Sequence, residues 1–410
     1  MLPGIAAAMM GPASMMTLLF AAVLSFLIAL CFAEVGSQFR GTGGAYLYAL
    51  RTFGDAPGFF VGWMVLVVTI TSWAAMVNAL ATAVAKSYIP ALADGPTRAI
   101  AIVAFMALLT GINMRGAKAG SQVSVVFTVA KIIPILLFVF VGIFHIDFDN
   151  FTPFAPHGFG SNFFEATLVI LYAFVGFEAM VVPAGEMANP RRAVPIALVV
   201  VLGVVTVLYI GVLAVATGTL PELAGQSYPV LASAEVFLGS TGVAFVAGGI
   251  IVSMIGVNSA QALVGPRRLF SLAEQGHMPK ALAKISSRGT PNGAMLALFV
   301  IASCIAVSGS FKTLALVSVV ARFAQYIMTC LAVMVLRHRR RTHHGQAEVE
   351  NSAFKLPWGP TIPVAALALC LWLLVESARS DAKPMIAGSV ALAAGVPVYL
   401  AILFKRSKSR

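Results

Sequence analysis

The sequence predicts an all-α polytopic membrane protein, and its composition and length are the features that predict it. Of the 410 residues, 60% are hydrophobic and 10% are charged, and the mean hydropathy is +0.94. Soluble globular domains contain roughly 25% charged residues, so this chain lacks the polar residues that a water-facing surface needs. At roughly 20 residues per span, the length allows about ten to twelve transmembrane helices. The composition excludes a soluble enzyme, a disordered chain and a fibrous protein.

Eleven apolar windows along the chain are long enough to cross or nearly cross a bilayer. Because backbone groups in the hydrocarbon must be hydrogen-bonded within their own segment, these windows predict helices rather than strands. The apolar residues before Gly11 are too few to span, so they predict a partial helix. The predicted spans are residues 14–33, 57–83, 98–114, 121–144, 163–183, 195–217, 241–264, 294–309, 313–336, 361–377 and 384–404.

The basic residues predict the orientation of these spans. Strict alternation places twenty of the 27 lysines and arginines on one set of connections and five on the other, and leaves Lys131 and Arg322 within spans. Because short loops rich in Lys and Arg stay in the cytoplasm, we expect a multi-pass protein of the cytoplasmic membrane with a cytoplasmic C-terminus. The larger set consists of Arg40, Arg51, Arg115, Lys118, Arg191, Arg192, Arg267, Arg268, Lys280, Lys284, Arg288, Arg337, Arg339, Arg340, Arg341, Lys355, Lys405, Arg406, Lys408 and Arg410.

The net charge of +12 is therefore mainly a topology signal. We expect the protein to contact the lipid bilayer, including anionic headgroups near the basic runs, and expect no nucleic acid partner. The four cysteines lie far apart in apolar stretches, so neither a metal site nor a disulfide is predicted. The chain contains no HExxH motif and no phosphate-binding GxxxxGKS/T loop. We therefore predict no enzyme activity, no cofactor and no ATP-driven pumping.

A few polar residues inside the predicted spans are candidate functional groups. They are Lys131, Glu178, Asn258, Gln261 and Arg322. A charge at mid-span costs roughly 2.5–3.5 kcal/mol on insertion scales, so charged residues there mark functional sites by default. Asn258 and Gln261 lie three residues apart on one helix face, where they serve either a site or hydrogen bonds between helices.

Glu178 follows Gly176 in the middle of the span at 163–183. Glycine weakens a helix by about 1 kcal/mol relative to alanine. A break here would expose carbonyl groups of one half-helix and amide groups of the next, which attract cations and anions respectively. Because such a break is tolerated only around a cavity, we predict a binding site at this point. The alternative is a continuous helix in which Gly176 is a packing notch.

Lys131 and Arg322 each lie about ten residues into their spans. Pro134 frees the carbonyl group of Ala130, so the Lys131 ammonium has an acceptor nearby. A buried lysine releases its proton more readily than an exposed one, which suits reversible proton carriage. The alternative is that Lys131 snorkels to the cytoplasmic interface. Arg322 does not deprotonate, so we expect it to pair with a carboxylate or with carbonyl groups, either structurally or as part of a site.

Five segments of the sequence are distinctive in combination. They are PGIAAAMMGPAS at 3–14, CFAEVGSQFRGTGGAYLYALRTFGDAPGFFVGW at 31–63, INMRGAKAGS with KIIP at 112–134, FVGFEA with GEMANPRRAVPIAL at 174–198, and GPRRLFSLAEQGHMPKALAKISSRGTP at 265–291. In this order, and over essentially the whole chain, they resemble the amino acid–polyamine–organocation (APC) transporter superfamily. The sequence therefore resembles an amino acid permease of that superfamily.

The resemblance implies a LeuT-type transporter fold of two inverted five-helix repeats with two extra C-terminal helices. Eleven full spans plus a partial first helix are present here. The first repeat would comprise residues 1–144 and the second residues 145–336. Residues 337–410 would form a cytoplasmic loop and the last two helices. In the superfamily the first and sixth helices are broken at mid-membrane, and the substrate binds at the breaks.

Carried over by position, the resemblance implies a substrate site on and near the sixth helix. Gly176 falls on its break, and the backbone carbonyl groups just before it would face the substrate ammonium. Gln261 falls near a position that contributes to the pocket or gate. The implied substrate-binding residues are Phe174, Val175, Gly176, Phe177, Glu178, Asn258 and Gln261.

Two further residues are implied in ion coupling. Lys131 matches the fifth-helix lysine that takes the place of a sodium ion in proton-coupled members. Inversion relates the fifth helix to the tenth, and Arg322 lies at a similar depth there. One feature departs from the superfamily pattern, because the Gly-x-Gly motif of the first helix would lie just before Met1. We expect the reading frame to continue upstream of Met1; the alternative is a shortened protein, for which transport is doubtful.

The sequence therefore favours a secondary active transporter for amino acids that works by alternating access, driven by protons or by exchange. The runner-up is a basic amino acid/polyamine antiporter, for which Glu178 would suit a cationic substrate, although Arg322 favours a neutral one. A different class of function is a non-transporting membrane sensor or subunit. The substrate's side chain, the direction of transport and homo-oligomerisation are left open.

Overall fold

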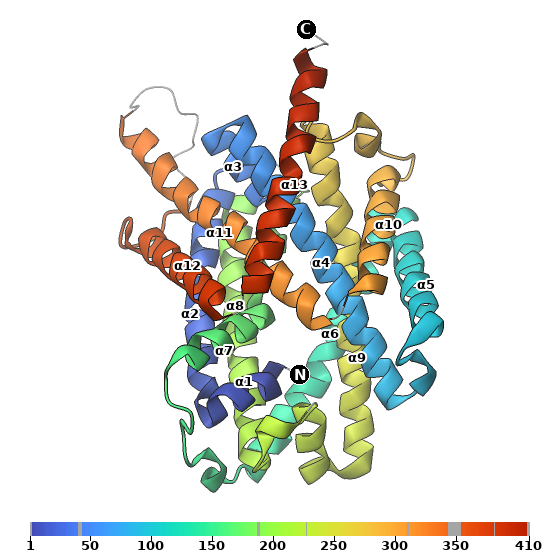
Figure 1. The fold of residues 1–410 in the computed structure, drawn as a ribbon, viewed down its shortest axis with the longest axis vertical. Helices are drawn as coiled ribbons and strands as arrows, with labels where there is room; N and C mark the ends of the chain where they lie inside the picture. The colour runs from blue at the N-terminus through green and yellow to red at the C-terminus, as the bar shows by residue number, and fades with distance from the viewer. Residues whose placement is uncertain are drawn as a thin grey trace.

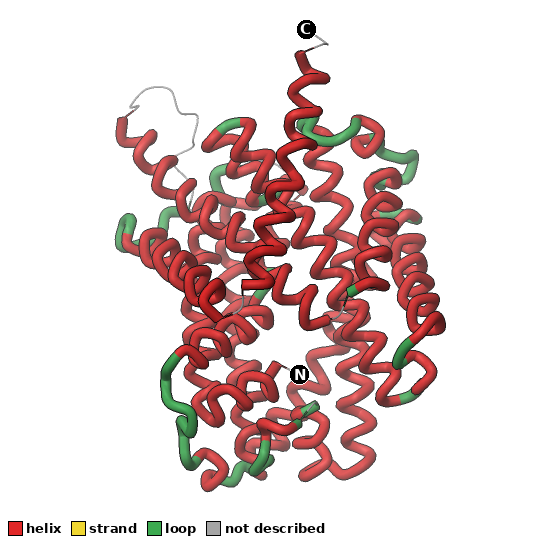
Figure 2. The backbone as a smooth tube through the Cα atoms, in the orientation of Figure 1, coloured by secondary structure: helices red, strands yellow, loops and turns green. Residues whose placement is uncertain are grey.

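The computed structural model describes residues 2–39, 43–186, 189–226, 228–309, 311–342, 354–380 and 382–407. In these ranges the regular secondary structure is entirely helical (Figures 1 and 2). Met1, Arg40, Lys408 and Arg410 of the sequence-based predictions lie outside them. The α-helices are α1 (Leu2–Met10), α2 (Ser14–Gly36), α3 (Ala45–Phe53), α4 (Asp55–Ser87), α5 (Gly95–Met114), α6 (Ala117–Gly142), α7 (Ser161–Phe174), α8 (Pro190–Thr219), α9 (Pro229–Glu274), α10 (Asn292–Ser308), α11 (Phe311–Thr342), α12 (Thr361–Ser380) and α13 (Ala382–Ser407).

Ten of the eleven predicted spans each coincide with one of these helices, and the span at 163–183 is divided between α7 and the helical turn η5. Across the described ranges, nine helical segments are long and apolar enough to cross a membrane; α1 and α2 together count as one of these, and α7 and α10 are shorter apolar helices. The protein is therefore an all-α polytopic membrane protein. Short helical turns complete the connections: η1 (Gly11–Ala13), η2 (Pro90–Leu92), η3 (Ile143–His145), η4 (Phe148–Phe151), η5 (Phe177–Glu186), η6 (Leu223–Gly225) and η7 (Lys280–Ala283).

The helices α9 and α3 differ most from the apolar windows. The window at 241–264 predicts only part of α9, which continues through Pro266 to Glu274 and is kinked at Gly239, where φ is +62°. The amphipathic helix α3 lies in a segment that the hydropathy pattern assigns to a connection. Hydropathy measures the lipid-facing length of a helix, so it misses turns that project beyond the hydrocarbon or that are covered by protein.

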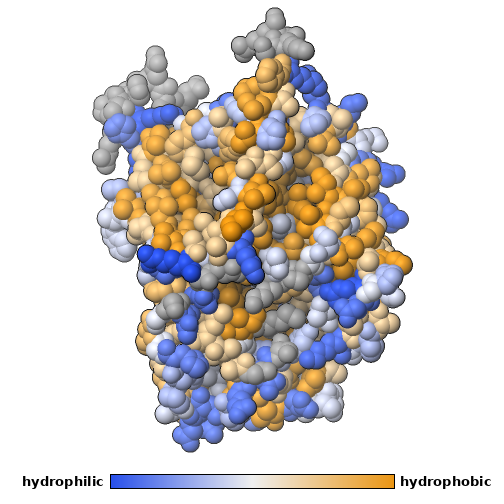
Figure 3. Space-filling view, in the orientation of Figure 1, coloured by the Kyte–Doolittle hydropathy of each residue, from blue (hydrophilic) through white to orange (hydrophobic). Residues whose placement is uncertain are grey.

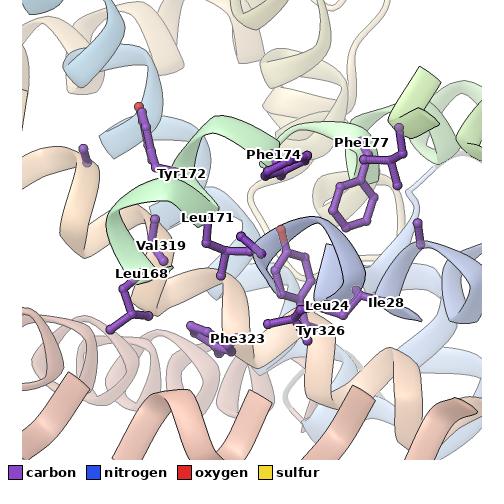
Figure 4. Close-up of a cluster of buried hydrophobic side chains, with 14 of the residues drawn as sticks. Leu24, Ile28, Leu168, Leu171, Tyr172, Phe174, Phe177, Val319, Phe323 and Tyr326 are labelled. Atoms are coloured by element: carbon purple, nitrogen blue, oxygen red, sulfur yellow. The ribbon is translucent and has the colours of Figure 1, made fainter. Parts of the chain in front are cut away.

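Apolar side chains lie both in the core and on the outer surface of the bundle. Leu24 and Ile28 of α2, Leu171 of α7 and Phe323 of α11 meet in one buried cluster (Figure 4). On the outside, α8 exposes a row of valines, of which Val207 is 70% exposed. Figure 3 shows a broad apolar surface of this kind. Because lipid solvates apolar side chains as well as protein does, such a surface is stable only in a bilayer or a detergent.

Figure 1 places α3, the connection between α9 and α10, and the C-terminal ends of α11 and α13 at one end of the bundle, here called the basic end. Glu34 of α2 is fully buried there and forms a two-pronged ion pair with Arg337 of α11. The Arg337 Nε–Glu34 Oε1 distance is 2.7 Å, and Leu356 N donates to the same carboxylate at 2.9 Å. This buried pair ties α2, α11 and the segment before α12 together.

His277 makes a second connection at the basic end. Its Nδ1 lies 2.8 Å from the Tyr46 hydroxyl, and its Nε2 lies 3.0 Å from Asp55 Oδ1. Asp55 also accepts hydrogen bonds from Arg406 and Tyr399 of α13. Because His277 is fully buried, this network joins α3, α4, the end of α9 and α13.

The stability of the basic end should depend on the protonation of His277. Burial lowers the pKa of His277 below its ordinary value of 6.5, although the Asp55 hydrogen bond opposes the shift. The unfolded chain therefore binds this proton at a higher pH than the folded chain, so stability should fall as pH falls from about 6.5 toward the lowered pKa. Thermal unfolding of purified protein across this pH range should show that slope, and His277→Gln should flatten it. The matched variant of the exposed His157, His157→Gln, should keep the slope, and identical slopes in both variants would contradict the assignment.

Candidate functional site

The helix that contains Glu178 is interrupted in the middle of the bundle. Helix α7 ends at Phe174, Val175 is extended, and Gly176 has a φ of +113° before the chain resumes as η5. The interruption therefore lies at the glycine that the sequence analysis singled out. A left-handed φ is accessible to glycine but costs other residues steric strain, so the sequence places glycine where the helix has to change direction.

The break orients Glu178 toward α11. The Glu178 side chain is 1% exposed and the Arg322 side chain 3%, and Arg322 Nε donates to Glu178 Oε1 at 2.8 Å. The second carboxylate oxygen accepts from Gly176 N at 2.9 Å and from the Tyr326 hydroxyl at 3.3 Å. The sequence left open whether Arg322 would meet a carboxylate or carbonyl groups; in the structure it meets the carboxylate of the broken helix.

Serine hydroxyls complete the surroundings of Arg322. Its Nη2 donates to Ser72 Oγ of α4 at 2.9 Å, and its Nη1 donates to Ser318 O and, at very short range, to Ser318 Oγ. The two serine hydroxyls lie 2.6 Å apart. A buried ion pair is stable only when its remaining donors and acceptors are satisfied, and here α4, η5 and α11 supply the partners.

Aromatic rings cover one side of the pair. Phe177 stacks on Tyr326 with ring centroids 5.8 Å apart and an interplanar angle of 15°, and Phe32 meets both rings edge-on. Figure 4 shows Phe177 and Tyr326 together, with Phe174 on the neighbouring turn. Phe174 instead meets the ring of Tyr209 at 5.5 Å. The side chains of Phe174 and Phe177 thus belong to the core around the break.

The other side of the pair faces a cavity of about 620 Å³. Its walls come from α1, α2, α4, α6, α7, η5, α8, α9 and α11, and α1 contributes Leu2 and Pro3. The volume suits a small metabolite. Of the residues that the sequence singled out, the cavity is lined by Lys131, Val175, Gly176, Glu178, Gln261 and Arg322.

Lys131 and Asn258 differ in their relation to this cavity. Lys131 lines it, and its ammonium has no hydrogen-bond or ion-pair partner in the described part of the chain. Asn258 is fully buried beside the cavity, where its Nδ2 donates to Met254 O at 2.8 Å and its Oδ1 lacks a partner among the described residues. The structure therefore brings Lys131 and the Glu178–Arg322 pair around one space and leaves Asn258 outside its wall.

The comparison with known families agrees with this arrangement. The family model described as "Amino acid permease" matches residues 2–396. The chain belongs to this family. Its members are membrane transporters rather than enzymes, and the described residues of this permease contain no cluster of histidine, cysteine and carboxylate side chains that could hold a metal ion.

Curated relatives cover most of the permease. It is 29% identical to the methylthioribose transporter of Bacillus subtilis (strain 168), over 90% of this chain and 82% of the relative. It is 28% identical to the branched-chain amino acid permease BcaP of the same strain, over 92% and 83%. The serine/threonine exchanger SteT of that strain is also 28% identical, over 93% and 86%. The substrates in the names of these relatives differ, so the relatives define a class of transporter rather than one substrate.

The structure also adds a charged residue that the sequence analysis assigned elsewhere. Arg268 was counted with the basic connections, but it lies within α9, is 5% exposed and lines the cavity of the permease. The prediction was wrong because the apolar window ends at residue 264, whereas α9 continues to Glu274. The spacing of Gln261, Gly265 and Arg268 places them on one helix face and was the available signal. Ser72, Ser318 and Tyr326 were missed because polar uncharged residues are common in transmembrane helices.

Replacing Gly176 should destabilise the permease without any steric clash. A Cβ at this position would meet nothing within 4 Å, yet φ is +113°. Gly176→Ala should therefore lower the free energy of unfolding by about 1–2 kcal/mol through backbone strain alone. Thermal unfolding in detergent measures the loss. The control is Gly248→Ala, at a position in open space within helix α9, and it should unfold at the wild-type temperature or above it. Equal unfolding temperatures for the two variants would contradict the prediction that backbone strain at Gly176 destabilises the variant.

Proposed function

We propose that this permease is a secondary active transporter that moves amino acids across the cytoplasmic membrane by alternating access. The observation that carries the proposal is the broken helix beside the cavity, where a buried ion pair and an unpaired lysine face the same space. Discontinuous helices around a mid-membrane cavity are the usual sites of transporters, because the free helix ends bind charged substrate groups.

The residues at the break have distinct roles in this proposal. The carbonyl groups of Phe174 and Val175 accept the substrate ammonium at the end of α7, where a helix carries partial negative charge. Glu178 keeps the break in its bent form through Gly176 N and Arg322, and thus couples substrate binding to the packing of α11. Gln261 contributes a polar side chain to the pocket wall.

Coupling to protons is assigned to Lys131. Its side chain lines the cavity and lacks a carboxylate partner, so the loss or gain of its proton changes the charge of the cavity directly. Exchange for a second substrate is the other mode of driving. If Lys131 kept the same protonation state throughout the transport cycle, proton coupling through this residue would be excluded.

The division into two inverted repeats, 1–144 and 145–336, followed by a cytoplasmic loop and two further helices at 337–410, remains part of the proposal. In that division α4 is the third helix of the first repeat and α11 is the fifth helix of the second. In the same way, α9 is the third helix of the second repeat and α6 is the fifth helix of the first. The inverted-repeat symmetry would map the pair α4–α11 onto the pair α9–α6. These two pairs make the most extensive helix contacts in the bundle, which supports the division. The basic end lies in the cytoplasm in this proposal, together with the C-terminus.

Reconstitution tests the function. Purified permease in proteoliposomes should take up labelled amino acids when an inward proton gradient or internal unlabelled substrate is supplied. A panel of neutral, acidic and basic amino acids defines the substrate class. Binding of an amino acid with no flux under either driving force would favour the sensor or subunit alternative, and no binding of any amino acid would overturn the proposal.

A further inference from the structure

We propose that the cavity selects amino acids with an anionic side chain, through Arg268. The inference rests on the proposed function and names its substrate class. It follows from the charges that line the cavity and not from the relatives above, whose names do not include this substrate class.

The cavity wall contains four charged side chains among the described residues: Glu178, Arg322, Lys131 and Arg268. Glu178 and Arg322 neutralise each other at 2.8 Å. Glu178 is thus committed to a cation of the protein itself and leaves no free carboxylate for a cationic substrate side chain.

Arg268 is held in place without a direct ion pair. Its Nη1 donates to Thr69 Oγ1 of α4 at 2.8 Å, whereas its buried Nε has no partner among the described residues. No carboxylate of the described chain forms an ion pair with Arg268. A guanidinium that is nine-tenths buried, positioned by one hydroxyl and facing a cavity is prepared to bind an anion in a forked geometry.

The charge of the preferred ligand follows from the charges of the four side chains that line the cavity. Arg268 stays charged whether Lys131 carries a proton or not, so the cavity holds at least one uncompensated positive charge. A neutral zwitterionic amino acid leaves this charge in place, and a basic amino acid adds to it. An acidic amino acid cancels it, because its side-chain carboxylate binds Arg268 while its backbone groups occupy the break at Gly176. Buried charge is costly unless paired, so the acidic class is favoured.

Competition and binding measurements test this selection. L-glutamate should compete for uptake, and should bind purified protein in calorimetry, about tenfold or more better than its isostere L-glutamine, since a charge-assisted hydrogen bond is the difference between them. L-leucine and L-arginine should compete worse than L-glutamate. Arg268→Gln should abolish the preference for glutamate over glutamine, and Arg268→Lys should restore part of it.

The adjacent arginine provides the control. Arg267 donates to Leu263 O on its own helix and does not line the cavity, so Arg267→Gln should keep the wild-type glutamate-to-glutamine ratio. This ratio separates charge recognition from a general loss of folding. If Arg268→Gln fails to fold, the wild-type ratio and Arg268→Lys still decide the question.

The outcomes separate this inference from the proposed function. Uptake of neutral or basic amino acids without a glutamate preference would overturn the inference and leave the transport function standing. Glutamate binding that depends on Arg268, with no flux of any amino acid, would support the inference and overturn the transport function. A wild-type protein that binds glutamate no better than glutamine would overturn the inference.

Discussion

Glu178→Gln should abolish transport and destabilise the permease by about 3–5 kcal/mol, the usual cost of removing one partner of a buried ion pair. The glutamine keeps the shape of the side chain but leaves the charge of Arg322 uncompensated at 3% exposure. The Tyr326 hydroxyl and Gly176 N would also lose their charged acceptor. Thermal unfolding in detergent and uptake into proteoliposomes measure the two effects.

The double variant Glu178→Gln/Arg322→Met separates the two effects. Replacing both partners of a buried pair is often neutral for stability, so this variant should unfold close to the wild-type temperature. It should still fail to transport, because the break is no longer tied to α11. The matched control Glu222→Gln changes an exposed carboxylate at a connection and should leave both measurements unchanged. Retained transport in Glu178→Gln would remove Glu178 from the mechanism.

Lys131→Ala should eliminate proton-driven accumulation while allowing exchange to continue. Lys131 is the cavity cation whose proton can leave, since arginine does not deprotonate in proteins. Without it, accumulation driven by an inward proton gradient should fall about tenfold or more, equivalent to about 1.4 kcal/mol of lost coupling. Counterflow of labelled against unlabelled substrate needs no proton and should stay close to the wild-type rate.

The control for this prediction is another lysine far from the cavity. Lys284 is exposed near the basic end, so Lys284→Ala should behave as the wild type in both assays. Proton-driven accumulation that survives in Lys131→Ala would exclude Lys131 from coupling. Loss of counterflow together with accumulation would instead assign Lys131 to substrate binding.

Local patterns in the sequence sufficed for the helices and for part of the site. The eleven apolar windows matched helices because the length of an apolar run is a local property that the bilayer thickness dictates. The interruption at Gly176 was also predicted locally, from a glycine and a carboxylate in mid-span. The resemblance that carried the family assignment rested on short motifs and agrees with the match over residues 2–396.

The partners of these residues could not be predicted in the same way. Glu178 and Arg322 are 144 positions apart, and no local pattern states which span supplies the counter-ion. Arg268 was misplaced because the apolar run ends before it, whereas α9 continues and buries it. The charge of the cavity is a sum over α6, η5, α9 and α11, so a single misplaced residue changes it by one full charge.

The sequence by itself determined that this chain is a polytopic helical permease with a helix broken at Gly176, because hydropathy and helix breaking depend on neighbours along the chain. Only the tertiary structure decided which charges meet. It paired Glu178 with Arg322 and left Lys131 and Arg268 facing the cavity without ion-pair partners among the described residues, so positive charge is in excess there. Burial makes each unpaired charge costly, and burial is a property of the packed bundle rather than of any segment.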